Sequence, residues 1–296
     1  MNVIRIIQAA VLAPLLSGAA LAADLPSRVA PAPAPLPPVF TWSGLYVGVN
    51  LGYSVGGVAD QQGGRLFAWN DVHPLVVGGP AWNVNGQMRG ILGGAQIGYN
   101  MQVSPTFVVG LEADIQGGDV RSTLAYAAPN PAPTAANSYG YMAAVQKVDW
   151  WGTFRGRLGA TPFAPNLLMY ITGGLAYGRV KNSLAYVDVN NEHPGLNIWG
   201  VNGQSGWKLG WTVGAGLEYA FASMPNLSLK AEYLYVNLGS RTTGVAATWS
   251  TLPCCGAAEV VNFNPVLSRA TTQFHVIRAG FNYRFGGGAG PVVARY

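Results

Sequence analysis

The chain has 296 residues, of which 50% are hydrophobic and only 10% are charged. A typical soluble domain has about 25% charged residues, so the composition argues against a soluble helical enzyme and against disorder. Glycine (40) and proline (20) both disfavour long helices. The formal net charge is +5, but the basic residues do not cluster, so the sequence gives no nucleic-acid signal.

The N-terminus has the pattern of a secretory signal peptide. Met1–Arg5 is a short basic start, Ile6–Leu21 is an apolar run, and small residues precede a cleavage site between Ala22 and Ala23. The run is shorter than the roughly 20 residues of a spanning helix, which disfavours a membrane anchor. We therefore predict that residues 1–22 are removed and that the protein is exported by the Sec pathway.

The rest of the chain divides by composition. Residues 23–40 are rich in proline and alanine and predict an extended periplasmic linker. Residues 41–285 form one domain, and residues 286–296 are a C-terminal extension. Glycine or polar residues interrupt every apolar stretch after residue 22, so the exported protein is either soluble or a β-barrel.

Apolar residues recur at every second position in eight segments of the domain. In the first, Leu45, Val47 and Val49 alternate with Tyr46 and Gly48. This period predicts β-strands with two different faces, and the segment length suits strands that cross a membrane at a tilt. The predicted strands are 45–53, 95–103, 107–115, 150–160, 169–177, 211–221, 227–235 and 275–285.

The connections between these strands alternate in length. Short turns join the second strand to the third, the fourth to the fifth and the sixth to the seventh, and long loops join the others. This order is typical of outer-membrane barrels, which have short periplasmic turns and longer extracellular loops. We predict an all-β fold, an eight-stranded antiparallel up-and-down transmembrane β-barrel with four long extracellular loops.

The charged residues of the predicted strands fall on one face, five acidic and five basic. The interior of an eight-stranded barrel is only wide enough for side chains, so charges of balanced sign would pair across it. The opposite face is nearly free of charge, as contact with lipid requires. The predicted lumen charge network consists of Glu112, Asp114, Asp149, Arg155, Arg157, Glu218, Lys230, Glu232, Arg278 and Arg284.

Aromatic residues lie near the predicted strand ends, where interfacial girdles form in membrane barrels. They include Trp42, Phe107, Phe221, Tyr283 and Phe285.

Seven glycine- and aromatic-rich motifs in register resemble one known family. They are WSGLYVG (42–48), GGAQIGYN (93–100), RGRLG (155–159), GGLAYG (173–178), Gly210–Phe221, KAEY (230–233) and RAGFNYRF (278–285). Over Phe40–Phe285 the chain resembles the small outer-membrane β-barrels of alphaproteobacteria, called outer-membrane immunogenic or porin-like proteins.

The resemblance implies an OmpA-like barrel in the outer membrane of a Gram-negative cell. It implies periplasmic chaperones and the outer-membrane assembly machinery as partners, together with outer-membrane lipids and lipopolysaccharide. The resemblance does not decide whether the protein forms a homo-oligomer. Such barrels commonly end on an aromatic residue, so either Phe281, Tyr283 and Phe285 form the insertion signal or Tyr296 supplies the terminal aromatic.

Little in the sequence points to catalysis or to the binding of a metal or cofactor. The three histidines lack the spacing of a metal site, and no catalytic residues are predicted, so we expect no enzyme, no metal and no cofactor. The adjacent Cys254 and Cys255 predict a vicinal disulfide in an oxidising compartment, or a bond to another chain. Some family members are reported to bind haem, which makes His73 and His193 candidate axial ligands, although both also suit solvated loops.

Three functions remain. The first is a surface-exposed, antigenic envelope protein with a salt-bridge-packed lumen. The alternatives are a small porin that conducts ions or small solutes, and a surface protein that binds haem or another ligand.

Overall fold

The computed structural model describes residues 40–57, 59–63, 68–69, 82–129, 138–190, 198–245, 248–249, 262–263 and 266–285. The predicted signal peptide with Ala22 and Ala23, the C-terminal extension, His73, His193, Cys254 and Cys255 lie outside these ranges. Among the described residues, no helix is long and apolar enough to cross a membrane.

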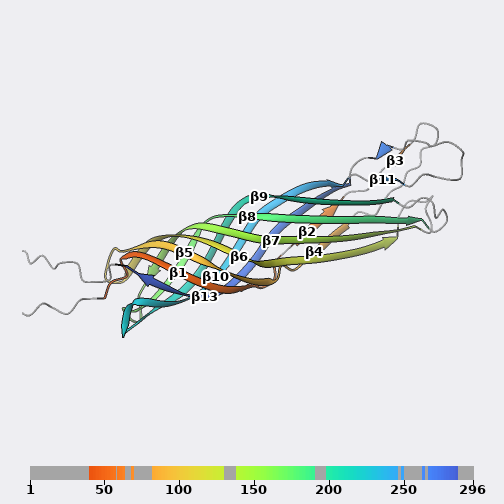
Figure 1. The fold of residues 1–296 in the computed structure, drawn as a ribbon. Helices are drawn as coiled ribbons and strands as arrows, with labels where there is room; N and C mark the ends of the chain where they lie inside the picture. The colour runs from red at the N-terminus through yellow and green to blue at the C-terminus, as the bar shows by residue number, and fades with distance from the viewer. Residues whose placement is uncertain are drawn as a thin grey trace, which may run out of the picture. The chain divides into compact units, whose positions relative to one another are not determined.

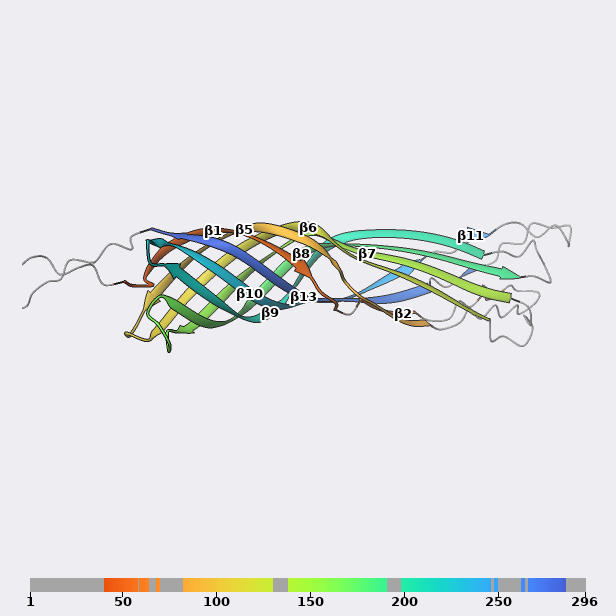
Figure 2. The same cartoon turned by 90° about the horizontal axis from the view of Figure 1, so that it is seen from below.

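Within the described residues, eight long antiparallel strands close into a ring (Figures 1 and 2). Each pairs with its neighbours along the chain, and the first pairs with the last at Tyr46↔Arg284 through Ser54↔Val276. The predicted fold class is thus confirmed. The ring strands are β1 (Gly44–Ser54), β5 (Gly90–Gln102), β6 (Phe107–Pro129), β7 (Ser138–Ala160), β8 (Leu167–Asn190), β9 (Ile198–Phe221), β10 (Met224–Val245) and β13 (Val266–Arg284).

Five shorter strands lie in the long connections. β2 (Ala59–Gly63) pairs with both β13 and β4 (Trp82–Gly86). β3 (Ala68–Trp69) pairs with β12 (Asn262–Phe263), and β11 (Thr248–Trp249) pairs with β9.

The strands are much longer than the sequence predicts. β6 to β10 have 22 to 24 residues, whereas a tilted membrane strand needs about 9–11. Each predicted segment lies at the end with the short turns, which we call the turn end. The ring strands other than β1 continue past it toward the opposite loop end (Figure 1). The predicted bounds of β6 to β10 were therefore too short, because these strands continue into the long connections.

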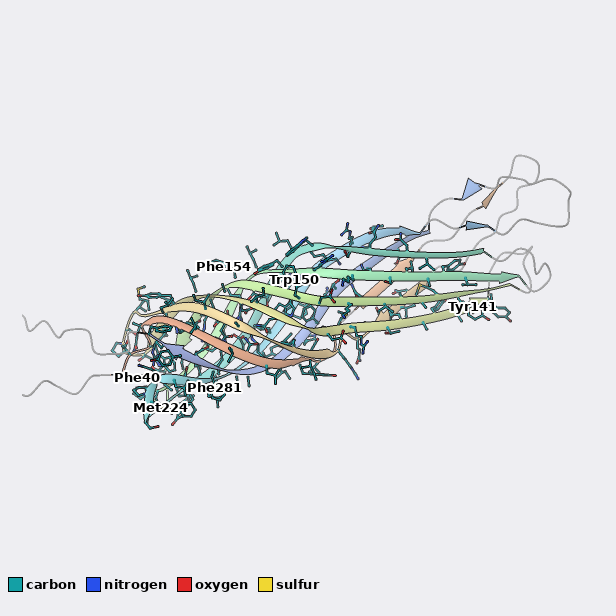
Figure 3. All side chains as sticks on the ribbon, viewed as in Figure 1. Phe40, Tyr141, Trp150, Phe154, Met224 and Phe281 are labelled. Carbon is teal, nitrogen blue, oxygen red and sulfur yellow. The ribbon has the colours of Figure 1, made fainter. Side chains whose placement is uncertain are left out.

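The outer face near the turn end is apolar. Leu51 is 67% exposed and Ile171 is 62% exposed, and Figure 3 shows Phe154 and Phe281 on the outside of the barrel. Exposed apolar area of this extent requires lipid rather than water around it. This apolar belt also includes Val47, Val49, Ile97, Tyr99, Leu111, Ile115, Leu158, Leu175, Leu209, Val213, Ile277 and Tyr283.

The predicted girdle aromatics are not all on this face. Phe107, Tyr283 and Phe285 are exposed, but Trp42 is fully buried. The prediction for Trp42 was wrong because residues 40–43 precede β1 and turn inward instead of continuing the strand. Phe281, Tyr283 and Phe285 lie at the end of β13 and face outward, and their role as an insertion signal stays a prediction.

Glycine on the inner face makes room for large polar side chains. A Cβ atom at Gly98 would overlap the hydroxyl of Tyr46, and one at Gly216 would overlap the hydroxyl of Tyr170. Both tyrosines donate hydrogen bonds inside the barrel. The glycine content of the chain is therefore partly a consequence of how tightly the lumen is filled.

We expect Gly98→Ala to lower the free energy of unfolding by about 1–3 kcal/mol, the usual cost of overpacking a core. The measurement is urea unfolding in lipid vesicles, followed by tryptophan fluorescence. Gly156→Ala is the matched control, because Gly156 faces outward and a Cβ there would have its nearest neighbour at 3.9 Å. Equal stability of the two variants would contradict a tightly packed lumen.

Candidate functional site

Four carboxylates and four cationic side chains form one ion-pair network inside the barrel. They come from five strands and each is at most 4% exposed. β6 supplies Glu112 and Asp114, β7 supplies Arg155 and Arg157, β9 supplies Glu218, β10 supplies Lys230 and Glu232, and β13 supplies Arg278. The alternation of side-chain direction along each strand brings these residues together, because residues two apart on a strand share a face.

Glu112 is the centre of this network. Lys230 Nζ lies 2.8 Å from both of its carboxylate oxygens, and Arg155 Nη2 contacts Oε1. Arg157 Nη1 lies 3.4 Å from Oε2 and Arg278 Nη2 lies 3.6 Å from Oε1. One buried carboxylate thus contacts all four cations, which come from three other strands.

The other carboxylates share the same cations. Arg155 Nη2 lies 2.9 Å from Asp114 Oδ2, and Arg278 Nη2 lies at the same distance from that oxygen. Glu232 lies 3.0 Å from Arg155 Nη1 and 2.5 Å from Arg278 Nη2. These contacts partly offset the desolvation of charges buried away from water.

Glu218 forms the branch of the network nearest the turn end. Arg157 Nη2 lies 2.8 Å from Glu218 Oε2. Ser228 Oγ and Asn282 Nδ2 donate to Oε1 at 2.6 and 2.9 Å. Both oxygens of this buried carboxylate therefore have hydrogen-bond donors.

Two tyrosines belong to the network although the sequence analysis did not include them. Tyr46 Oη donates to Glu112 at 2.7 Å and accepts from Arg157 at 2.7 Å. Tyr170 Oη donates to Glu232 at 3.0 Å, and the Arg157 guanidinium lies 3.9 Å from the ring centroid of Tyr170. Their inward positions in the alternation were the available signal, since each shares the face of the strand that the network occupies.

Two of the ten predicted residues are outside the network. Arg284 is buried, but its Nη2 donates to the carbonyl of Pro225 at 2.6 Å, and its guanidinium packs over Phe40 and Trp42. Asp149 contacts Lys147 and Lys181 near the outer surface, at 3.3 and 2.5 Å.

The prediction for Asp149 was wrong because the pairing of β7 with β8 shifts there. Val148 is opposite Val180 and Trp150 is opposite Arg179, so Asp149 has no residue opposite it. An extra residue of this kind breaks the alternation of faces.

An apolar layer closes the lumen on the turn side of the network. Trp42 packs there with Val108, Leu168, Tyr170 and Ala220. Its indole Nε1 donates to the carbonyl of Pro165 at 2.8 Å, and Phe40 packs edge-to-face against it with ring centroids 5.2 Å apart. Figure 3 places Phe40 at this end of the barrel.

A larger apolar layer closes the lumen on the side of the ion-pair network that faces the loop end. Trp151 and Phe274 cross it edge-to-face, with ring centroids 5.5 Å apart. The whole layer is buried and consists of Met88, Leu92, Val120, Val148, Trp151, Ala176, Val180, Leu234, Val236, Leu238, Phe274 and Val276. The ion pairs therefore lie between two water-excluding layers.

A polar group follows beyond this second layer. Thr272 Oγ1 accepts hydrogen bonds from Lys208 Nζ at 2.9 Å and from Gln146 Nε2 at 2.6 Å. These three residues link β7, β9 and β13 across the interior. The sequence analysis missed Lys208 because it precedes the predicted strand 211–221.

Comparison with known proteins identifies the family. The model of the outer membrane protein beta-barrel domain matches residues 9–285. The chain belongs to this family. It is 32% identical over 281 residues to the 31 kDa outer-membrane immunogenic protein of Brucella melitensis, which covers 93% of this chain and 97% of that protein. A 22 kDa outer membrane protein of Rhizobium leguminosarum bv. viciae is 30% identical over 212 residues, 70% of each chain.

Among solved structures, the outer membrane protein OprG from Pseudomonas aeruginosa is similar with a TM-score of 0.35 and 12% identity. The match covers 82% of this chain and 96% of that one.

The barrel is thus an integral outer-membrane protein, and its orientation follows. Outer-membrane barrels have short turns on the periplasmic side and longer connections outside the cell. The turn end is therefore periplasmic and the strand extension beyond the apolar belt is extracellular. The relatives above are named as outer-membrane or immunogenic proteins, not as enzymes. In the described part of the chain, no group of three or more His, Cys, Asp and Glu could hold a metal ion.

We expect Glu112→Gln to destabilise the barrel strongly, because four cations would then share three carboxylates. Removal of one partner from a buried ion pair costs about 3–5 kcal/mol, and urea unfolding in vesicles measures it. The double variant Glu112→Gln/Lys230→Met keeps three carboxylates and three cations in the network. It should therefore recover part of the lost free energy of unfolding.

The control for this experiment is Asp149→Asn, which removes a carboxylate from ion pairs at the outer surface. Exposed ion pairs contribute about 1 kcal/mol or less. If Glu112→Gln lowered the free energy of unfolding by no more than this control does, the network would not be the electrostatic core of the barrel.

Proposed function

We propose that this protein is a closed structural barrel that carries a rigid β-extension at the cell surface and has no solute pathway through the membrane. The observation that supports this most is the order of layers in the lumen. Apolar, ion-paired and apolar layers follow one another along the barrel, and their side chains are almost completely buried.

A water-filled pore needs a continuous polar lining. Along the inner face of β7, Arg157 and Arg155 are followed by Thr153 and then by the buried Trp151 and Val148. Ion permeation past Trp151 would require dehydration next to apolar side chains, which is the basis of a hydrophobic gate. The apolar layer therefore opposes conduction more directly than the ion pairs do.

The extension supports the surface role. β6 to β9 continue past the apolar belt with hydrogen-bonded pairing up to Pro129↔Tyr139 and Ser138↔Asn190. Figure 3 shows Tyr141 toward the end of this region. A folded, regular surface of this kind presents fixed epitopes, which fits the name of the Brucella relative, an immunogenic protein.

Single-channel recording in a planar bilayer tests the closed lumen. We expect no conductance steps from the wild type, nor from Arg155→Ala/Arg157→Ala, since both apolar layers remain in that variant. Trp151→Ala/Phe274→Ala should produce conductance steps if it stays folded, because it removes the two aromatic side chains of the larger apolar layer.

Phe154→Ala is the matched control, because it removes an aromatic side chain from the lipid face of the same strand. Insertion of each variant is verified by its heat-dependent shift on a detergent gel. Regular steps from the inserted wild type would overturn the proposal in favour of the porin.

A further inference from the structure

Four basic residues lie directly opposite one another, one immediately before β5 and the others on β6, β7 and β8. Arg89 bridges to Arg121 on β6, Arg121 pairs with Lys147 on β7, and Lys147 pairs with Lys181 on β8. We call this row, Arg89–Arg121–Lys147–Lys181, the cation ladder. Its backbone geometry is regular, since Arg89 and Arg121 exchange two backbone hydrogen bonds of 3.0 Å.

The ladder faces outward. All four residues are solvent-accessible, and the side chains of Arg121, Lys147 and Lys181 are 65%, 40% and 48% exposed. Directly opposite residues on neighbouring strands have Cβ atoms about 4.5–5.5 Å apart, and like charges at this separation destabilise a sheet. Three consecutive like-charged pairs therefore need a compensating anion.

Among the described residues, two carboxylates supply part of that compensation. Asp119 contacts Arg121 at 3.6 Å and Lys147 at 3.1 Å, and Asp149 contacts Lys147 and Lys181. Arg179 adds a fifth base on the same face of β8. Within the part of the chain that the structure describes, five bases against two acids give this patch a formal charge of +3.

Two groups of the patch form hydrogen bonds that favour their charged forms. Hydrogen bonds from Lys181 and Lys147 lower the pKa of the Asp149 carboxyl. Hydrogen bonds to Asp119 and Asp149 raise the pKa of the Lys147 ammonium. Both shifts favour the charged forms of Asp149 and Lys147.

The position of the ladder restricts the chemistry of a ligand that could bind there. It lies just beyond the apolar belt, where Trp150 packs between Tyr177 and Trp207 at the belt's extracellular edge. Interfacial aromatic residues of this kind mark the level of the lipid head groups. A ligand that spans both regions has apolar chains against the belt and anionic groups at the ladder.

We propose that the cation ladder binds the phosphate groups of a phosphorylated glycolipid in the outer leaflet, with the acyl chains of that lipid on the apolar belt. Phosphate oxygens accept strong, charge-assisted hydrogen bonds from arginine and lysine. A row of four cations matches a head group that carries more than one phosphate. The site gives the predicted lipopolysaccharide partner a defined place on β6 to β8 and on Arg89, which precedes β5. The site does not depend on whether the lumen conducts.

Native mass spectrometry of the detergent-solubilised protein tests the proposal. Wild-type protein is titrated with bisphosphorylated lipid A and with the same lipid after enzymatic dephosphorylation. We expect Arg121→Gln/Lys181→Gln to bind the phosphorylated lipid about tenfold more weakly, because charge-assisted contacts are lost. The dephosphorylated lipid should bind both proteins equally weakly.

Arg241→Gln/Arg269→Gln is the matched control, since it removes two exposed bases from β10 and β13, away from the ladder. It should change the affinity by less than twofold. Inorganic phosphate and a lipid-free phosphorylated oligosaccharide distinguish a lipid site from a general anion site, and neither should displace the lipid at equal concentration.

Three results would overturn the proposal. One is equal affinity of the wild type and the ladder variant for phosphorylated lipid A, with the heat-dependent gel shift of both proteins intact. Another is equal wild-type affinity for the two lipids, which would leave the apolar belt as the sole determinant. The third is displacement by the lipid-free oligosaccharide, which would indicate a soluble anion.

Discussion

The pairing of buried charges inside a ring of eight strands is the constraint on which the structure depends. Among the described residues, four carboxylates and four cations occupy the centre of the barrel, almost inaccessible to solvent. An unpaired ion in such a place costs several kcal/mol. Each strand that carries a network charge must therefore place it at the same height along the barrel axis as its partners. Glu112, which contacts Arg155, Arg157, Lys230 and Arg278, links the registers of β6, β7, β10 and β13. A slip of one residue in any of these strands would turn its charges toward lipid.

The rest of the interior follows from this requirement. Apolar layers with Trp42 on one side and Trp151 and Phe274 on the other keep water from the ion pairs. Inward glycines such as Gly98 and Gly216 leave room for the tyrosine hydroxyls that complete the hydrogen bonding. Replacement of buried ion pairs by apolar residues is often neutral or stabilising, so the network contributes more to register than to net stability. The lumen behaves as a packed core in which polar and apolar layers alternate.

Alternation in the sequence was enough to predict the eight strands, their two faces and eight of the ten lumen charges. It failed where the period changes. Asp149 is an extra residue in the pairing of β7 with β8, and Trp42 precedes the first strand, so neither follows the period of two. The strand extension was missed because both of its faces are mixed in polarity. Leu124 faces inward beside Ser122, and Lys147 faces outward beside Val145, so the period-two signal is weak there. The cation ladder could not be found from the sequence, since its members are far apart along the chain and only the register aligns them.

The claim that the lumen is a dry, ion-paired core is tested most directly by NMR of the arginine side chains. The protein would be labelled with ¹⁵N-arginine in lipid nanodiscs, and exchange of the guanidinium protons with water would be measured. The account predicts slow exchange and restricted rotation for Arg155, Arg157 and Arg278, and fast exchange for the exposed Arg121 and Arg269. Fast exchange at Arg155, equal to that at Arg269, would show that water reaches the network and would contradict the account.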